Sequence, residues 1–432
     1  MALGPLRLPS PDRSLLLARE GYLFTARLKE DERRTLYETG ALGIGLLGRP
    51  ALVVTGAVGV DLFYDESRLQ RHRAIPPPIA LSLFGPGAVH ALDDDAHHHR
   101  KALFRHALSE SGLDRLLLIA ESRWRVAVDR WEATGGGEVY SSAIDVFGTS
   151  IIEWAGIDEP GDAMRRHARW LAQIVDGFGA FGPAYLRAVA ARRRCDRWAA
   201  ELIRGEREDR SAAPTSWLDE VASFVDVDGR LLPERTAAVE LLNVLRPTVA
   251  VAWLASFAAI ALAEHPDWRS RIRDERAAAP GRGEVAQAFA HEVRRYYPFV
   301  PVLAARARRE FEFAGHTVAE NQRVLLDVYG TDHGPGWDHP WAFDPERFIG
   351  TDPCAIPEFI PQGGGPVDTG HRCPGEGFSN GLLALTVQLL AEIDDIDLSQ
   401  QDRHFSMRRM PTRPASGTRM ALQAPQMLKR YA

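Results

Sequence analysis

Apolar residues recur at spacings of three and four along most of the chain after about residue 93, which is the pattern of helices that bury one face. The helix expected over 284–297 also has a stop signal, because Pro298 follows it and proline disfavours a helical residue before it. The pattern therefore predicts a mainly helical protein. The other helices are expected over residues 94–108, 113–131, 141–155, 162–175, 185–204, 233–263 and 374–393.

Two stretches show strand patterns instead. Residues 41–55 contain two short apolar runs around Gly48, which predict a β-hairpin. Residues 302–328 alternate in the manner of short strands, and a loop-rich tract follows from 330 to about 370. We therefore expect a minor β region that is built from about 41–80 together with 302–328.

Composition favours one large domain over residues 1–432. Length alone, at roughly 150 residues per domain, would suggest about three domains. The chain instead has the balance of one globular unit, 45% hydrophobic and 25% charged, and no Gly/Ser-rich or Pro-rich linker divides it. The net charge of −6 includes no basic excess, which argues against a general nucleic-acid binder.

Nothing in the sequence points to export or to a membrane. The N-terminal residues lack an apolar run followed by a small-residue cleavage site, so no signal peptide is expected. The longest apolar stretch, 248–263, is shorter than the roughly 20 residues needed to span a bilayer, so we expect no transmembrane segment. Cys195, Cys354 and Cys373 form neither a CxxC pair nor a disulfide framework. The sequence favours a cytoplasmic protein.

Cys373 lies where a glycine-rich loop meets the helix expected from Pro374. Unpaired N–H groups at a helix start favour negative charge, so we expect a lowered thiol pKa and a thiolate that binds a metal or acts as a nucleophile. A phosphate loop would need a Gly-Lys-Ser/Thr ending, and Cys354 is 19 residues away, too far for a compact zinc pair. An inert buried cysteine stays open. The loop glycines would admit a large flat ligand: Gly363, Gly364, Gly365 and Gly370.

The segment 359–393 resembles the haem-binding loop of the cytochrome P-450 family, in which a cysteine thiolate is the axial ligand of haem iron. Residues 292–295 resemble the family's Glu-x-x-Arg motif, and 345–348 resemble the segment whose arginine completes a Glu–Arg–Arg cluster. Taken alone, the first motif could be an ordinary surface pair. The resemblance covers essentially the whole chain and implies the cytochrome P-450 fold, haem b and Cys373 as iron ligand. It also implies structural roles for Glu292, Arg295 and Arg347.

His97 and Lys101, one helical turn apart, occupy the place of the family's helix that reaches the haem propionates. His371 is a third candidate for that role, because cations and N–H donors suit carboxylates. By themselves, the consecutive histidines at 97–99 could be a solvated face or a weak metal site. Their combination with Cys373 favours haem.

The long helix over 233–263 has an unusual charge pattern. Residues 241–263 contain no Asp or Glu, and the only charge among them is Arg246, which Pro247 follows. Pro247 removes a backbone hydrogen bond and tends to kink the helix. A buried arginine is costly unless an anion pairs with it. One alternative is that Arg246 pairs with a protein carboxylate or reaches water. The other is that the missing anion is a substrate carboxylate, which the guanidinium binds through two parallel hydrogen bonds.

Residues 245–248, Leu-Arg-Pro-Thr, together with the loop 363–370 resemble one branch of the family, the bacterial fatty-acid peroxygenases. This resemblance implies that Arg246 binds the substrate carboxylate, which then acts as general base and general acid on hydrogen peroxide. No redox partner protein is then required. The α and β carbons lie nearest the oxidant, so hydroxylation there is expected, with decarboxylation to a terminal alkene as a parallel outcome.

Residues 83–90 resemble the distal loop of that branch. Phe84 would line the substrate pocket, and His90 would hydrogen-bond the oxidant or assist proton transfer. Phe299 resembles another apolar pocket residue, although a lone phenylalanine is core packing by default. Two other functions stay open: a conventional monooxygenase fed by redox partners, and a haem-binding sensor without enzymatic activity.

Overall fold

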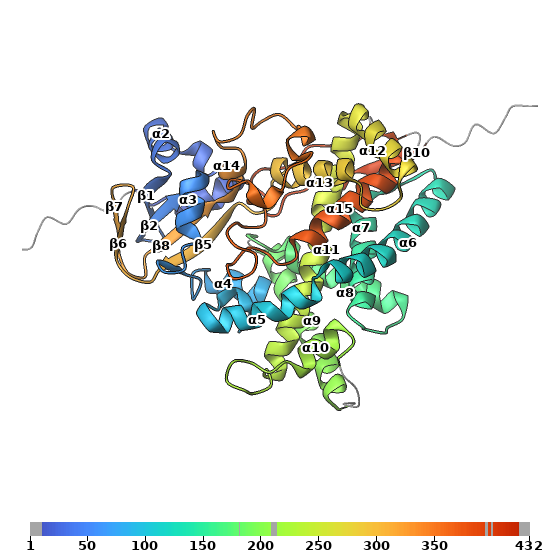
Figure 1. Cartoon of the computed structure of the whole chain (residues 1–432), viewed down its shortest axis with the longest axis horizontal. Helices are drawn as coiled ribbons and strands as arrows, with labels where there is room; N and C mark the ends of the chain where they lie inside the picture. Colours follow the sequence, from blue (N-terminus) through green and yellow to red (C-terminus); the bar gives the residue numbers. More distant parts are fainter. Residues whose placement is uncertain (1–10, 181, 209–213, 394–395, 399–400, 423–432) are drawn as a thin grey trace, which may run out of the picture.

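The computed structural model describes residues 11–180, 182–208, 214–393, 396–398 and 401–422. Long helices occupy most of the chain after residue 93, so the mainly helical prediction is confirmed (Figure 1). The helices expected from apolar spacing are α5 Asp94–Ala107, α6 Glu110–Thr134, α7 Val139–Trp154, α8 Gly161–Asp176, α9 Pro183–Glu208, α11 Glu234–Glu264, α13 Glu284–Tyr296 and α15 Glu376–Ala391.

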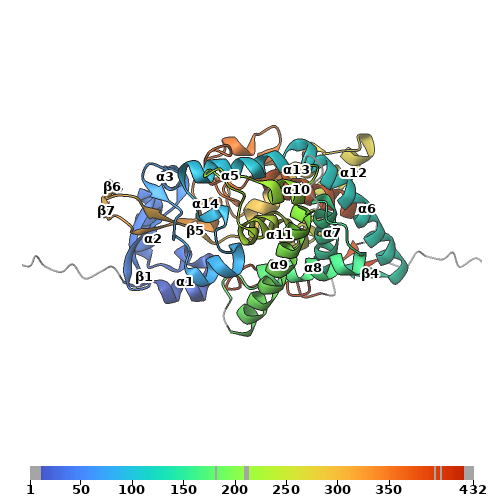
Figure 2. The ribbon, with the colours of Figure 1, turned by 90° about the horizontal axis from the view of Figure 1, so that it is seen from below.

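Helix α11 is the central element of the fold, and Figure 2 shows it among α7, α8, α9 and α10. It packs against α7, α9 and α15, and nearly all of its residues from Ala237 to Leu262 are buried. In the described residues, α11 alone is long and apolar enough to cross a membrane, yet 94% of its apolar window is buried inside the protein. Burial in the protein interior explains its uniform hydrophobicity without a bilayer.

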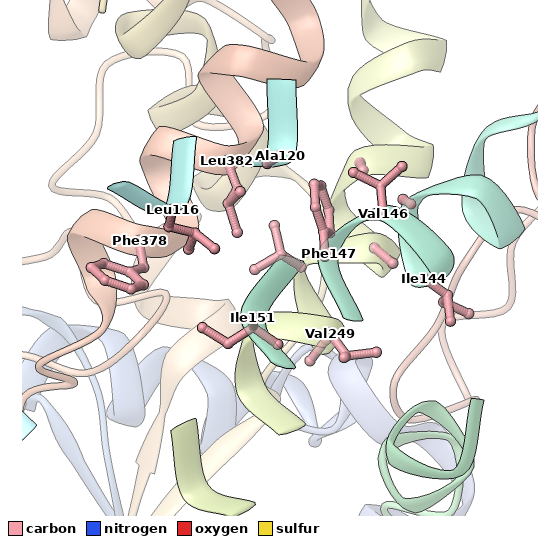
Figure 3. Close-up of a cluster of buried hydrophobic side chains, with 14 of the residues drawn as sticks. Leu116, Ala120, Ile144, Val146, Phe147, Ile151, Val249, Phe378 and Leu382 are labelled. Atoms are coloured by element: carbon pink, nitrogen blue, oxygen red, sulfur yellow. The ribbon is translucent and has the colours of Figure 1, made fainter. Parts of the chain in front are cut away.

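Side chains from four helices meet in the main core (Figure 3). Helix α7 packs against α11 and α6, and α15 also packs against α11 and α6. The labelled side chains are Leu116 and Ala120 of α6, Ile144, Val146, Phe147 and Ile151 of α7, Val249 of α11, and Phe378 and Leu382 of α15. This packing joins the long helix to the helix that follows Cys373.

The minor β region joins the two expected stretches of sequence. Its five-stranded sheet has the order β1-β2-β8-β5-β3, with β2 parallel to β8 and the other neighbours antiparallel. The hairpin around Gly48 is formed by β1 and β2, as predicted. The strands are β1 Ala41–Leu46, β2 Arg49–Val54, β3 Leu69–Gln70, β5 Val302–Ala307 and β8 Arg323–Asp327, with the separate hairpin β6 Phe311–Phe313 and β7 His316–Val318. A third sheet, which the pattern does not predict, contains β4 Gly136–Glu138, β10 Arg419–Leu422 and β9 Ile396–Asp397.

Some helices fall outside the expected set, and two of them, α2 Glu30–Thr39 and α12 Pro266–Ala278, carry almost no apolar face. Leu36 is the buried residue of α2, whose other side chains are mostly charged, and Ile272 and Arg276 are those of α12. Short segments such as α3 depend on the sheet beside them rather than on their own periodicity. These helices are α1 Ser14–Glu20, α2 Glu30–Thr39, α4 Pro77–Ile79, α10 Trp217–Ser223, α12 Pro266–Ala278 and α14 Val328–Asp332, and α3 spans Gly56–Phe63.

Candidate functional site

Cys373 lies on the loop that leads into α15. The helix begins at Glu376 with Gly375 as its N-cap, so Pro374 is not its first helical residue as the sequence had suggested. The Cys373 amide donates to the carbonyl of Gln362 at 3.2 Å, and the Gln362 side chain donates to the Ser379 hydroxyl at 2.7 Å. The loop is therefore closed on itself and attached to α15.

Cys373 is half-buried, and desolvation of its thiol raises the pKa above the usual value. The Gly375 amide and the charge of Lys101 lower the pKa, but they do not outweigh desolvation. The expected lowering by the helix start is thus wrong, because the thiol lies ahead of the helix in an apolar setting. The thiolate form therefore depends on a cation bound at the sulfur.

Three of the loop glycines make a close contact within the protein that the sequence does not predict. Gly363 and Gly365 have φ angles of +92° and +74°, which side chains rarely adopt. A Cβ at either position would lie 2.7–2.8 Å from atoms of Tyr64. A Cβ at Gly364 would lie 2.9 Å from Ile360. These glycines let the cysteine loop pack closely against the end of α3.

His97, Lys101 and His371 are brought together beside the cysteine loop. The rings of His97 and His371 stack with their centroids 3.8 Å apart, and His97 Nδ1 is buried without a hydrogen-bond partner. Lys101 Nζ donates to the carbonyls of Gly370 and Arg372, the latter at 2.9 Å. Burial and Lys101 lower the pKa of His97 to about 3, so its ring is neutral. One side of the loop thus combines a cation with an unused ring nitrogen.

Arg71 is a member of this cluster that sequence reasoning missed. It is buried, donates through Nη2 to the Phe63 carbonyl at 2.9 Å and lies 4.3 Å over the Phe63 ring. Its charge contributes to the lowered pKa of His371. Because Arg71 directly follows the two-residue strand β3, no apolar periodicity marks it as buried.

The structure reduces the alternative of a weak metal site at the three consecutive histidines to two of them. Ligand atoms of Glu66, His97 and His98 lie within 4.8 Å of one another. His99 instead has its Nε2 2.8 Å from the Val225 carbonyl, so the three consecutive histidines do not share a site.

Glu292, Arg295 and Arg347 form the expected cluster behind the loop. Arg295 contacts both oxygens of Glu292 at 2.7 Å, and Arg347 Nε lies 3.7 Å from Glu292. Neither Glu292 nor Arg295 exposes its side chain to solvent, so the pair is not a surface pair. The motif's inner Arg294, which the sequence did not single out, binds Glu376 of α15 and so connects α13 to the cysteine loop.

Arg246 projects from α11 into the protein interior and is 4% exposed. Its Nη1 donates to the Leu83 carbonyl at 2.7 Å and its Nη2 to Asn243 Oδ1 at 3.2 Å, while Nε has no partner. Burial, together with the charge of Arg192, lowers its pKa to about 9. Within the described ranges no carboxylate pairs with Arg246, which disfavours the alternative that a protein carboxylate neutralises it.

The distal loop brings Phe84 and His90 to Arg246. The guanidinium lies 5.3 Å over the Phe84 ring, and the ring centroids of Phe84 and His90 are 4.3 Å apart. Both side chains line a cavity of about 60 Å³. Burial and Arg246 lower the pKa of His90 to about 3, so the imidazole is neutral, and its Nδ1 has no partner. Pro247 lies within α11, which continues through it.

Phe299 is placed differently. It is half-buried against the main helical core, and its carbonyl accepts a hydrogen bond from the Tyr22 hydroxyl at 2.8 Å. This is the packing position expected of a lone phenylalanine.

Arg192 of α9 is a second buried cation that the sequence analysis missed. Its Nη1 donates to the Leu83 carbonyl at 3.1 Å, and its Nε donates to Asp196 at 2.7 Å. A signal for it exists, because Arg192 shares a helix face with the buried residues Ala188 and Cys195.

The residues fit a bound haem. A half-buried thiol lies on a closed loop, and a cationic cluster lies beside that loop. Phe84 and the neutral His90 line a cavity, and Arg246, whose Nε has no partner, lies over the Phe84 ring. A sulfur ligand with cations for carboxylate groups is the donor set of haem-thiolate proteins.

Comparison with known proteins supports this arrangement. The cytochrome P-450 family description matches residues 190–392. A variant of cytochrome P450SP alpha (CYP152B1) has a TM-score of 0.87 at 35% identity, covering 95% of this chain and 98% of that one. Ligand-free cytochrome P-450 OleT has a TM-score of 0.87 at 33% identity, with coverage of 95% and 98%. A Mycobacterium tuberculosis protein assigned as cytochrome P-450 137 is 25% identical over 96% of this chain and 90% of its own length.

The similarity to these two solved structures extends over nearly the whole chain. The chain therefore belongs to the cytochrome P-450 family, as an oxidoreductase that binds haem b.

Proposed function

We propose that this protein is a haem-thiolate peroxygenase that uses hydrogen peroxide to hydroxylate fatty acids at the α or β carbon, with decarboxylation to a terminal alkene as a parallel outcome. The observation that carries the proposal is the state of Arg246, a buried cation without a carboxylate partner among the described side chains. Two similar structures contain carboxylic acids: a variant of OleT with arachidonic acid, and cytochrome P450EX alpha with myristic acid.

Cys373 would hold the haem iron through its sulfur. The carboxylates of the haem would lie toward His97, Lys101 and His371, with the Arg71 guanidinium adjacent. When bound, haem supplies the redox chemistry that uses peroxide to oxidise a C–H bond. Lys101 also holds the loop carbonyls, so it supports the cysteine as well as the cofactor edge.

Arg246 binds and orients the substrate carboxylate. Its Nε–H is free, while Nη1 and Nη2 are held by Leu83 and Asn243, so the guanidinium has a fixed direction. The bound carboxylate would take a proton from one oxygen of hydrogen peroxide and return it to the other, so that the O–O bond breaks with water as the leaving group and the remaining oxygen atom enters the substrate C–H bond. Because the carboxylate is fixed, the adjacent α and β carbons are the ones held in the reacting position.

Pro247 supports this geometry because it cannot donate to the carbonyl one turn earlier, which loosens α11 next to Arg246. His90 is neutral and can donate or accept one hydrogen bond, but it does not compete with Arg246 for the carboxylate. Phe84 covers the guanidinium with its ring and keeps water away from the ion pair. We also assign Phe299, which packs against the main helical core, to the lining of the substrate pocket.

Since the substrate and peroxide together provide the proton-shuttling group and the oxidant, no redox partner protein is required. We place the protein in the cytoplasm, where a free fatty acid and hydrogen peroxide would be its partners.

The test is Arg246→Ala in the haem-loaded protein. We expect haem content to be unchanged, while fatty-acid binding and peroxide-driven turnover fall by at least two orders of magnitude, as loss of a buried charged contact implies. Arg193→Ala, an exposed arginine on α9, is the matched control and should behave as wild type. Unchanged turnover in Arg246→Ala would reject the anchoring role.

Two rival functions can be distinguished by supplying either peroxide or a reductase system and by adding a fatty acid. A conventional monooxygenase would turn over with a ferredoxin and its reductase and would be inactive with peroxide alone. A sensor without activity would show neither a fatty-acid-induced change in the haem spectrum nor consumption of peroxide.

A further inference from the structure

Glu240 is a carboxyl group inside α11 that the proposed chemistry does not use. It is fully buried and accepts hydrogen bonds from the Val89 amide at 2.8 Å, from Asn243 Nδ2 at 2.9 Å and from Arg100 Nη1 at 3.3 Å. It lies nearly two helical turns before Arg246, too early in the sequence to pair with it directly. Its connection to the site therefore runs through its neighbours.

Asn243 makes that connection. Its amide donates from Nδ2 to Glu240 and accepts at Oδ1 from Arg246 Nη2 at 3.2 Å. An amide has a donor end and an acceptor end, so the group that faces one end determines what the other end presents. Both oxygens of Glu240 act as acceptors, Oε1 from Val89 and Arg100 and Oε2 from Asn243, so Asn243 turns its own oxygen toward the guanidinium.

The distal loop is held by the same carboxyl group. Glu240 accepts from the amide of Val89, directly before His90. Arg100, which also touches Glu240, donates to the Gly87 carbonyl at 2.8 Å and pairs with Asp226. One buried carboxyl group thus fixes the backbone on one side of His90 and, through Asn243, the guanidinium of Arg246.

We propose that Glu240 and Asn243 are positioning residues that set the hydrogen-bonding direction of Arg246 and thereby its affinity for a carboxylic acid substrate. This inference rests on the proposed function, because it assumes that Arg246 binds the acid. It goes further by assigning the specificity for a carboxylate head group to a relay of three side chains along α11.

Glu240→Gln is the decisive change. The new amide would keep its oxygen toward the two donors Val89 and Arg100, and would turn its NH₂ group toward Asn243. Asn243 would then flip and present its own NH₂ group to Arg246, donor against donor. The guanidinium would lose an acceptor and be displaced, without any change in the volume of the pocket.

Asn243→Asp tests the relay at Asn243, the residue that connects Glu240 to Arg246. The substitution keeps the size of the side chain but places a carboxylate beside Arg246, which would neutralise the guanidinium from inside the protein. Glu264→Gln is the matched control, since Glu264 is a half-exposed residue at the other end of α11 that pairs with Arg403.

The experiment measures binding of dodecanoic acid and of 1-dodecanol to each haem-loaded variant by calorimetry. We expect the dissociation constant for the acid to rise about tenfold in Glu240→Gln and Asn243→Asp, equivalent to about 1.4 kcal/mol, with the alcohol unchanged. Equal weakening of acid and alcohol, or unchanged acid binding in both variants, would overturn the relay. If Glu240→Gln fails to load haem, Asn243→Asp alone decides.

Arg246→Ala separates this inference from the proposed function. If that variant binds the acid as wild type does, the anchoring role itself fails. If it loses the acid while both relay variants keep it, the anchor stands and the relay is rejected.

Discussion

Arg192 and Arg246 donate to the same carbonyl oxygen, that of Leu83, from two different helices. The distances are 3.1 and 2.7 Å, and both guanidinium groups are buried. Two like charges converge there because each satisfies part of its hydrogen bonding on the loop that carries Phe84. The loop is therefore positioned by α9 and α11 together.

Arg192→Leu removes one of these two attachments. We expect the loop to loosen and Phe84 to lose its place over Arg246, which weakens binding of a fatty acid and of the corresponding alcohol alike, by up to about tenfold for the loss of a charged hydrogen bond. Calorimetric titration with both ligands measures the two dissociation constants. An acid-specific loss would mean that Arg192 acts on the carboxylate and not on the loop.

Gly85→Ala tests how tightly this loop is packed. Gly85 has a φ of +91°, and a Cβ there would lie 2.2 Å from Arg192 Nη2 and 2.8 Å from Val239. We expect a loss of about 2–4 kcal/mol in the free energy of unfolding, from backbone strain and overpacking together. Thermal or denaturant unfolding gives the value.

Gly87→Ala is the matched control for that change. Gly87 also has a positive φ, +73°, but a Cβ there would meet Thr236 no closer than 3.4 Å. It should lose only the conformational part, about 1 kcal/mol. Equal losses in the two variants would contradict the overpacking at Gly85.

Cys373→Ser tests the iron ligand. A hydroxyl is a much weaker ligand than a thiolate, so we expect the absorption spectrum of thiolate-ligated haem to disappear together with peroxide-driven turnover. Cys354→Ser changes an exposed cysteine and should leave both unchanged. A thiolate spectrum that survives in Cys373→Ser would assign the ligand to another residue.

The sequence predicts the parts of this molecule that carry a strong pattern. The long helices with an apolar face appear where expected. Helices α2 and α12 are missed because most of their residues are charged and few of their side chains are buried. Arg246 is recognisable because a single charge interrupts a long apolar helix.

The supporting residues are harder to find because their partners are distant in sequence. Glu240 contacts Val89 and Arg100 across about 150 and 140 residues, and no local spacing links them. The pKa of Cys373 is predicted in the wrong direction, because burial of the thiol is a tertiary effect that a helix-start argument does not include.

Asp327→Asn tests whether a buried carboxyl group outside the cysteine loop makes the stability of the protein depend on pH. Asp327 accepts from the Thr25 hydroxyl and from the Gly330 amide, and burial raises its pKa from 3.8 to about 6. Its neutral form is therefore favoured in the folded protein, and ionisation costs stability as the pH rises from about 4 to about 6.

Asn mimics the neutral acid and caps α14 equally well. We therefore expect Asp327→Asn to be more stable than wild type by about 1–3 kcal/mol above pH 6, with the difference vanishing below about pH 4. Denaturant unfolding of both proteins across this pH range measures the difference. A constant difference at every pH would show that Asp327 does not titrate in this window, and a loss of stability at neutral pH would show that its charge is needed by Thr25 and Gly330.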